Sequence, residues 1–137
     1  MSNHHCEYLV FRCMDFRIKG SVLGDLLDGA GIGEGNYDLV ACAGSAKDLL
    51  GREEEKNFLL KQIALSRKLH QIKNVAVLYH DNCGAYGIAD QEQEDEIQRN
   101  DLVKIKGIIA EQFPDLRFTA FIIKGVLLGD ISLEKIF

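Results

Sequence analysis

Three residues in two separated segments have side chains that bind borderline or soft metal ions. Cys13 begins the segment CMDFR at residues 13–17, and His80 and Cys83 stand in HDNCG at residues 80–84. Two thiolates and one imidazole form a ligand set that zinc favours, and a catalytic zinc typically keeps three protein ligands and one open position. The residues therefore predict a zinc site. Taken alone, however, the spacing of His80 and Cys83 also fits a capping histidine beside a buried thiol.

Two charged residues lie close to Cys13 in the sequence, at positions where packing of an apolar core would not require charged side chains. Asp15 and Arg17 alternate with Cys13 and Phe16, and charged side chains at a buried strand end need compensation. One interpretation is a salt bridge that closes the end of a sheet. The other is functional: Arg17 holds the Asp15 carboxylate, which accepts a hydrogen bond from zinc-bound water.

The elements that must position these residues are short apolar strands alternating with longer amphipathic helices. Helical spacing of apolar residues predicts helices over Glu53 to Leu69 and Ile97 to Phe113, the second stopped by Pro114. The polar run Gln91 to Asp101 is interpreted as a loop or a solvated face. Strands are predicted for apolar and β-branched runs at Tyr8 to Phe11, Tyr37 to Val40, Val75 to Tyr79 and Phe118 to Ile123, with an edge strand in the tail from Val126 to Phe137.

Strands that alternate with helices imply crossover connections and therefore a parallel sheet covered on both faces. The predicted fold class is α/β, with a mainly parallel central sheet flanked by helices in one domain spanning residues 1–137. Ligands of such sheets bind beyond the carboxyl ends of the strands. Cys13 and His80 both closely follow predicted strands, so they would meet there if these two strands are neighbours.

Composition narrows the range of partners. The chain has 137 residues, 47% hydrophobic content and a net charge of -5, which offers no broad positive field for nucleic acid or an anionic membrane. No apolar run reaches the roughly 20 residues that span a bilayer, and the start lacks a secretory pattern. We expect a cytoplasmic protein with reduced cysteines and a small-molecule substrate.

Several other signals favour ordinary structural roles. The glycine-rich run Gly29 to Gly35 precedes a strand, whereas a phosphate-binding loop follows one. Cys42 could be a fourth metal ligand, but simple packing is favoured. His4, His5 and Cys6 could bind metal adventitiously at a flexible terminus. His70 ends a predicted helix, where a cation suits the helix dipole, and is given no catalytic role.

The paired motifs resemble those of the beta-class carbonic anhydrases. C-x-D-x-R follows the first strand and H-x-x-C-G follows a later one, and nearly the whole chain shares the resemblance. The stretch Gly24 to Gly44 is similar to the helix, glycine-rich turn and second strand of that family. The end, from Phe118 to Phe137, is similar to its last central strand and short hairpin.

The resemblance implies zinc bound by Cys13, His80 and Cys83, with Asp15 and Arg17 beside it. It also implies reversible hydration of carbon dioxide to bicarbonate. Zinc lowers the pKa of bound water from about 15.7 to about 7, so zinc-bound hydroxide could attack carbon dioxide at neutral pH. Gly44 and Gly84 follow two of the strands and are possible pocket residues, and Gly84 and Gly87 would permit a tight backbone around the ion.

Departures from the family pattern keep other functions open. The run Ala41-Cys42-Ala43-Gly44 stands where the family usually has Arg-Asn-Ala-Gly, Gly51 to Lys56 resembles an insertion, and few residues precede the first strand. The alternatives are a hydrolase of carbonyl sulfide or carbon disulfide on the same site, or a non-catalytic zinc-binding relative with a regulatory role. Because the family builds its pocket between subunits, we expect a homodimer or a larger even-numbered oligomer.

Overall fold

Within residues 4–137, which a computed structural model describes, five strands form one sheet. Their order across the sheet is β2-β1-β3-β4-β5. Strands β1 to β4 pair in parallel, and β5 pairs with β4 in the antiparallel direction. The bounds are β1 (Tyr8–Cys13), β2 (Tyr37–Cys42), β3 (Asn74–His80), β4 (Arg117–Lys124) and β5 (Ser132–Lys135).

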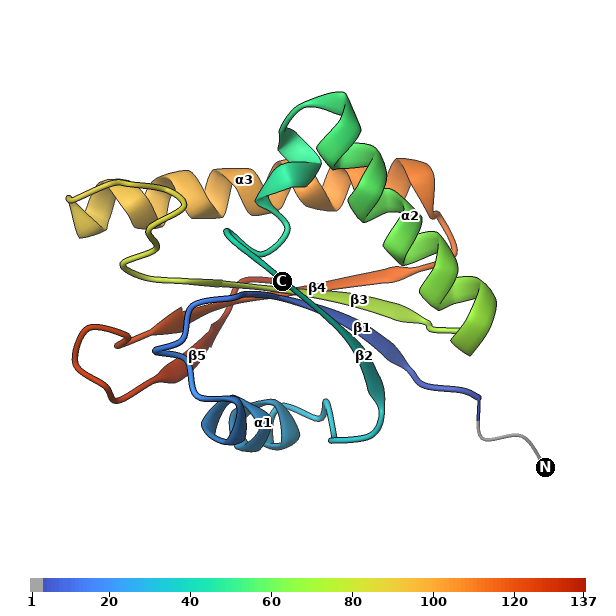
Figure 1. Cartoon of the computed structure of the whole chain (residues 1–137), viewed down its shortest axis with the longest axis horizontal. Coiled ribbons are helices and arrows are strands. Elements are labelled where there is room, and N and C mark those ends of the chain that lie inside the picture. Colours follow the sequence, from blue (N-terminus) through green and yellow to red (C-terminus); the bar gives the residue numbers. More distant parts are fainter. Residues whose placement is uncertain (1–3) are drawn as a thin grey trace.

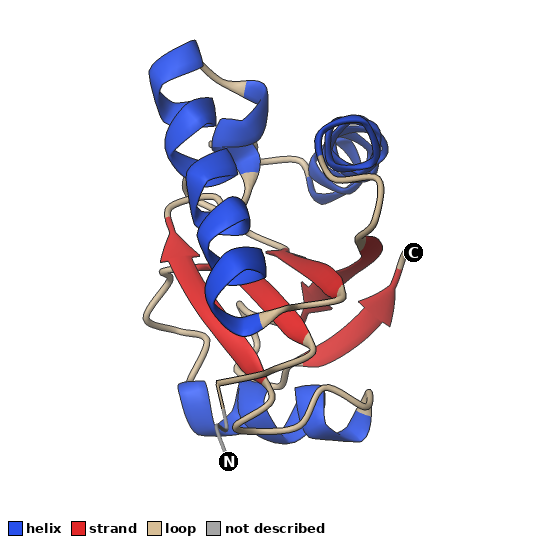
Figure 2. Cartoon of the chain, turned by 90° about the vertical axis from the view of Figure 1, so that its right-hand side faces the viewer, coloured by secondary structure: helices blue, strands red, loops and turns tan. Residues whose placement is uncertain are grey.

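Helices cover both faces of the sheet, as crossover connections between parallel strands require. Figures 1 and 2 show α1 (Gly20–Gly29) on one face and α2 (Glu53–His70) with α3 (Gln91–Gln112) on the other. The short 3-10 helix η1 (Lys47–Leu50) lies beside α2 and α3. The predicted fold class is confirmed: a mainly parallel sheet flanked by helices. No helix within residues 4–137 has both the length and the hydropathy needed to cross a membrane.

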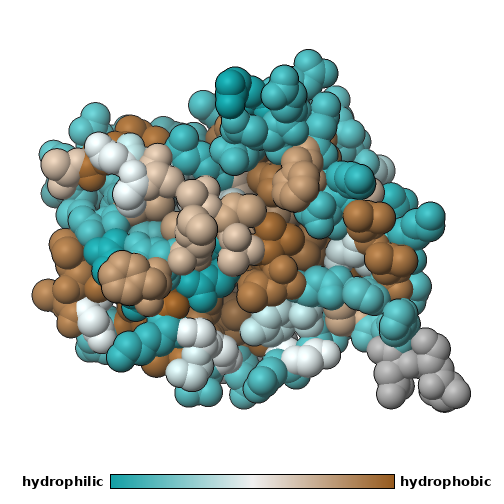
Figure 3. All heavy atoms as spheres, in the orientation of Figure 1, coloured by the Kyte–Doolittle hydropathy of each residue, from teal (hydrophilic) through white to brown (hydrophobic). Residues whose placement is uncertain are grey.

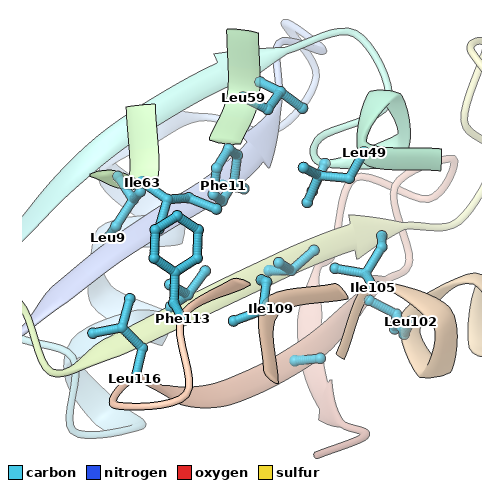
Figure 4. Packing of buried hydrophobic residues seen from close by; sticks show 14 of the residues in the cluster. Leu9, Phe11, Leu49, Leu59, Ile63, Leu102, Ile105, Ile109, Phe113 and Leu116 are labelled. Atoms are coloured by element: carbon cyan, nitrogen blue, oxygen red, sulfur yellow. The ribbon is translucent and has the colours of Figure 1, made fainter. Parts of the chain in front are cut away.

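Side-chain alternation along the strands creates two separate apolar layers. On β1, Leu9 and Phe11 face α2 and α3, whereas Val10 faces α1. Figure 4 shows the larger layer, in which side chains of α2, α3 and η1 meet those of β1. Burying each such aliphatic or aromatic side chain stabilises the fold by about 1.5–3 kcal/mol. The two layers therefore hold the sheet from both faces, and the carboxyl ends of the strands can carry functional residues.

The interpretation of the polar run from Gln91 to Asp101 as a loop was wrong, because the run is helical, and its interpretation as a solvated face fails at two positions. Helix α3 begins at Gln91, after Asp90 caps it by accepting from the N–H groups of Glu92 and Gln93. Glu94 and Gln98 are buried at 1% exposure each. They extend the helix face that later carries buried leucine and isoleucine. The expected edge strand in the tail is confirmed as β5.

Candidate metal centre

The structure brings Cys13, His80 and Cys83 together at the carboxyl edge of the sheet. Cys13 is the last residue of β1 and His80 is the last residue of β3, and these two parallel strands are neighbours. Cys83 follows three residues after His80. One donor atom from each residue lies within 4.8 Å of the other two, and all three residues are buried. The predicted convergence follows from strand order alone.

The imidazole of His80 is held in one orientation. Its Nδ1 donates a hydrogen bond to the carbonyl oxygen of Asp81 at 2.6 Å, and a carbonyl can only accept, so Nδ1 carries the proton. The Nε2 atom is buried and has no hydrogen-bond partner among residues 4–137. A buried nitrogen with a free lone pair is unfavourable without a partner. A metal ion would use that lone pair, and backbone support of the other ring nitrogen is typical of histidine ligands.

The side chains of Cys13 and Cys83 interact so that one of them is favoured as a thiolate and the other as a thiol. A neighbouring Cys83 thiol, which can donate to a Cys13 thiolate, outweighs burial and lowers the pKa of Cys13 to about 3. The same interaction, with burial, raises the pKa of Cys83. The pair thus holds a negative charge readily, and a bound cation would favour ionisation of the second thiol as well.

Asp15 faces the three donors while Arg17 holds it in place. The Arg17 Nη2 and Nε atoms donate to the Asp15 carboxylate at 2.6 and 3.0 Å, and the Arg17 backbone N–H donates at 2.9 Å. These hydrogen bonds lower the pKa of Asp15 to about 2. Asp15 Oδ2 lies 3.7 Å from His80 Nε2. Arg17 also donates to the side-chain and backbone oxygens of Asn82, at 2.7 and 2.8 Å, so it ties the two loops together.

Two residues of α3 that sequence reasoning missed hold the loop after β3. The Glu94 carboxylate accepts from the backbone N–H groups of Asn82 at 2.6 Å and Cys83 at 2.8 Å. The Gln98 amide donates to the carbonyl of His80 at 2.7 Å. Their spacing of four residues puts both on one helix face, one turn apart. That spacing continues the apolar stripe of α3, but the sequence alone does not show that these two polar residues are buried.

The backbone of the loop bends at Gly87, as expected, and at Asn82, which was not expected. Asn82 adopts a positive φ of 52° and Gly87 one of 62°, whereas Gly84 is not in the left-handed region. Gly44 has a φ of 76°, and a side chain there would press on Ala85. Gly87 fits the prediction of a tight backbone, while Gly84 has a different setting: open space surrounds it.

A pocket of about 490 Å³ opens beside the donors. Its polar contributors are Asp15 and Arg17, and apolar walls come from Ala43, Ala85 and the backbone of Gly84. Met14 and Phe16 form its rim and are 63% and 90% exposed. The arrangement suits a small, weakly polar molecule approaching a buried metal.

Cys42 lies beside this centre without joining it. Its backbone pairs in register with that of Cys13, but its sulfur is not among the three donors that meet. The side chain packs against the larger apolar layer, and burial raises its pKa. This placement agrees with the packing role favoured from the sequence.

Comparison with known proteins agrees with this geometry. A family model described as "Putative carbonic anhydrase" matches residues 3–120, a range that contains both segments of the candidate centre. Two similar curated proteins, each 28% identical to this chain, are uncharacterized. The one from Rickettsia bellii (strain RML369-C) aligns over 83% of this chain and 74% of its own length. The one from Rickettsia conorii (strain ATCC VR-613 / Malish 7) aligns over 89% and 73%.

Solved structures of beta-carbonic anhydrases share the fold at low sequence identity. A tetrameric enzyme from the ascomycete Sordaria macrospora superposes with a TM-score of 0.59 at 12% identity, covering 96% of this chain and 81% of that one. An enzyme from Trichomonas vaginalis gives 0.55 at 12% identity, covering 97% and 85%. The enzyme CafA from Aspergillus fumigatus gives 0.52 at 15% identity, covering 98% and 77%. The similarity extends through nearly all the elements described above.

Proposed function

Because the chain belongs to the "Putative carbonic anhydrase" family, we propose that it binds one zinc ion and catalyses the reversible hydration of carbon dioxide to bicarbonate. Cys13, His80 and Cys83 would hold the ion. The observation that carries the proposal is the meeting of their three donor atoms within 4.8 Å, with His80 Nε2 buried and lacking a partner in the described chain. A two-thiolate, one-imidazole set suits zinc better than a hard cation such as magnesium.

The chain's own residues would prepare the site for a proton-releasing reaction. Zinc bound there would lower the pKa of its bound water molecule to about 7, from about 15.7 for free water. Asp15 lies 3.7 Å from the imidazole and stays ionised because Arg17 holds it, so it can accept a hydrogen bond from that water. In this role Asp15 orients the attacking oxygen, and Arg17 is a positioning residue.

The apolar pocket walls would receive carbon dioxide. Ala43, Ala85 and Gly84 offer few polar contacts beside Cys13 and Asp15, which suits a small molecule without strong hydrogen-bonding groups. Carbonyl sulfide and carbon disulfide share that character, so they are the competing substrates for the same site. The other alternative is that the protein is a family relative that binds zinc without catalysing a reaction. The run from Ala41 to Gly44, which stands where the family usually has Arg-Asn-Ala-Gly, is the reason for considering it.

We also propose that the chain works as a homodimer or a larger even-numbered oligomer. Met14 and Phe16 are exposed at the rim of the pocket, and the edge strand β2 exposes Leu39 at 53%. The face presented in Figure 1, with β2 in front, carries apolar patches among polar ones (Figure 3). A second subunit that covered the rim would exclude water from the pocket, and the Sordaria macrospora relatives are tetrameric.

The test combines metal content with turnover. By elemental analysis, Cys13→Ser and Cys83→Ser should each hold about one zinc per chain less than purified wild type. Cys42→Ser is the matched control and should retain the metal. Stopped-flow hydration of carbon dioxide, with parallel assays on carbonyl sulfide and carbon disulfide, identifies the substrate. Zinc retained with no turnover of any of the three would support the non-catalytic alternative, and equal zinc in all four proteins would refute the ligand set.

A further inference from the structure

A second group of metal-binding side chains lies at the opposite edge of the sheet. Cys6 precedes β1, Asp38 is the second residue of β2, and His70 is the last residue of α2, just before β3. One donor atom from each lies within 4.8 Å of the other two. Because β1, β2 and β3 run in parallel, their amino ends meet at this edge, and the Cys13 centre lies at the other. Figure 1 shows the N-terminal segment beside the end of α2.

Backbone hydrogen bonds hold the N-terminal segment against the end of α2. The Cys6 N–H donates to the carbonyl of His70 at 3.1 Å, and the His5 Nδ1 donates to the same oxygen at 3.2 Å. That oxygen belongs to the last turn of a helix, where carbonyls lack partners within the helix. The segment read from the sequence as a flexible terminus is therefore ordered from Cys6 onward, and its thiol is buried.

Asp38 and His70 are already arranged as a supported pair. One oxygen of the Asp38 carboxylate accepts from Ser66 Oγ and contacts His70 Nδ1, both at 2.6 Å. The second carboxylate oxygen and the second ring nitrogen are not used by these contacts. Because Asp38 and His70 already point toward one another, an ion bound between them would take the place of this hydrogen bond.

We propose that Cys6, Asp38 and His70 form a second site for zinc or a divalent ion of similar preference, independent of the Cys13 centre. Sulfur, nitrogen and carboxylate oxygen are all zinc ligands, with bonds of about 2.0–2.3 Å that place tetrahedral donors about 3.3–3.8 Å apart. The three donor atoms lie within 4.8 Å of one another, and the 2.6 Å contact between Asp38 Oδ2 and His70 Nδ1 would widen when an ion binds.

The surroundings leave room for the ion and for a fourth ligand. A pocket of about 180 Å³ adjoins the three residues, and His4 and His5 line it as well. The His4 ring stands edge-on to the His70 ring with centroids 5.3 Å apart, so His4 is a candidate fourth ligand. Four protein ligands would make the site structural. The ion would then join the N-terminal segment to β2 and α2.

The experiment first removes the other centre. In the double variant Cys13→Ser/Cys83→Ser, equilibrated with zinc and desalted, we expect about one zinc per chain to remain. Adding Cys6→Ser or His70→Gln should reduce this at least about tenfold, and adding Cys42→Ser should leave it unchanged. His70 and Asp38 are about 30% exposed, so His70→Gln should fold, which circular dichroism would verify.

Two further measurements separate this site from a loose histidine chelate. Cobalt substituted for zinc in the double variant should show thiolate charge-transfer absorption that disappears with Cys6→Ser, because only a cysteine ligand produces it. Zinc should also raise the unfolding temperature of the double variant and not that of its His70→Gln derivative. No zinc retained by the double variant would overturn the proposal. So would zinc that survives Cys6→Ser and His70→Gln but is lost with His4→Gln/His5→Gln.

Discussion

The carboxylate of Glu94 lies 2.8 Å from the backbone nitrogen of Cys83 and accepts its hydrogen bond. Its other oxygen accepts from the N–H of Asn82 at 2.6 Å. Both contacts are formed at a residue with 1% exposure, where hydrogen bonds to a charged group are strong and leaving a donor unpaired is costly. Helix α3 thereby fixes the backbone of Cys83 and, through it, the position of the thiol.

Replacing Glu94 with Gln should weaken metal binding. The amide can accept with one oxygen only, and its NH₂ group would face a backbone N–H. We expect zinc affinity to fall about 10–100-fold, measured by competition with a chromophoric chelator, and the free energy of unfolding to fall by about 1–3 kcal/mol. Glu96→Gln is the control, because Glu96 is exposed on the same helix. Equal zinc affinity in the two variants would contradict the positioning role.

Arg17→Ala should separate zinc binding from turnover. Without Arg17 the Asp15 carboxylate can rotate toward the donors, 3.7 Å from His80 Nε2 at present, and carboxylate oxygen is an acceptable zinc ligand. We expect zinc content near wild type and carbon dioxide hydration reduced at least about tenfold at pH 7, with partial recovery at higher pH where hydroxide competes better.

Arg17→Lys tests whether charge alone suffices. Lysine cannot reproduce the forked contacts to Asp15 and Asn82, so it should recover only part of the rate. Full activity in Arg17→Ala across the pH range would show that the pair is a structural salt bridge.

Gly125→Ala should destabilise the turn between β4 and β5 more than Gly129→Ala. Both glycines have a positive φ, 88° and 71°, which costs alanine about 1–2 kcal/mol. A Cβ at Gly125 would also overlap the carbonyl oxygen of Asp130, while nothing lies within 4 Å of one at Gly129. We expect Gly125→Ala to lose about 1–3 kcal/mol more, measured by urea unfolding. Similar urea midpoints for Gly125→Ala and Gly129→Ala would show that overlap with the Asp130 carbonyl oxygen does not destabilise the protein.

Asp95→Asn should make stability less dependent on acid pH. Burial favours the neutral carboxyl, but hydrogen bonds from Lys124 and Arg99 outweigh it and lower the pKa of Asp95 below its ordinary 3.8. A lowered pKa adds stability that is fully present above that ordinary value and disappears as the pH falls below it. The variant should therefore be less stable than wild type at pH 7, with the difference shrinking toward pH about 3.

Urea midpoints across that range would measure the effect, and Glu96→Gln should show no such convergence. Because these side chains are about a third exposed, we expect at most about 1 kcal/mol, decreasing with salt. A difference that stays constant with pH would mean that the ion pairs contribute nothing.

The strands and their parallel pairing could be predicted because both depend on strong local patterns, whereas the order of the strands across the sheet could not. Apolar runs mark the strands, parallel pairing follows from the helices between them, and the ends of parallel strands share an edge. Asp15 and Arg17 lie near Cys13 because both closely follow the strand that ends at Cys13.

Contacts made by polar residues far apart in the sequence could not be predicted. Glu94 and Gln98 look like solvated helix positions until their partners, backbone groups of the loop after His80, are known. The contact of Asp38 with His70 spans 32 residues and has no local signature. Hydrogen bonds satisfied across elements leave no periodic pattern, so burial of a carboxylate cannot be read from hydropathy alone.

The position of α3 determines how the loop that carries Cys83 can unfold. Its first turns hold the loop through Glu94 and Gln98, and its later turns contribute Leu102, Ile105 and Ile109 to the core. The loop cannot open while the helix stays docked without leaving the Glu94 carboxylate buried and unpaired. We therefore expect the amide hydrogens of Asn82 and Cys83 to exchange with solvent about as slowly as those of the central strands, because exchange would require α3 to leave the core.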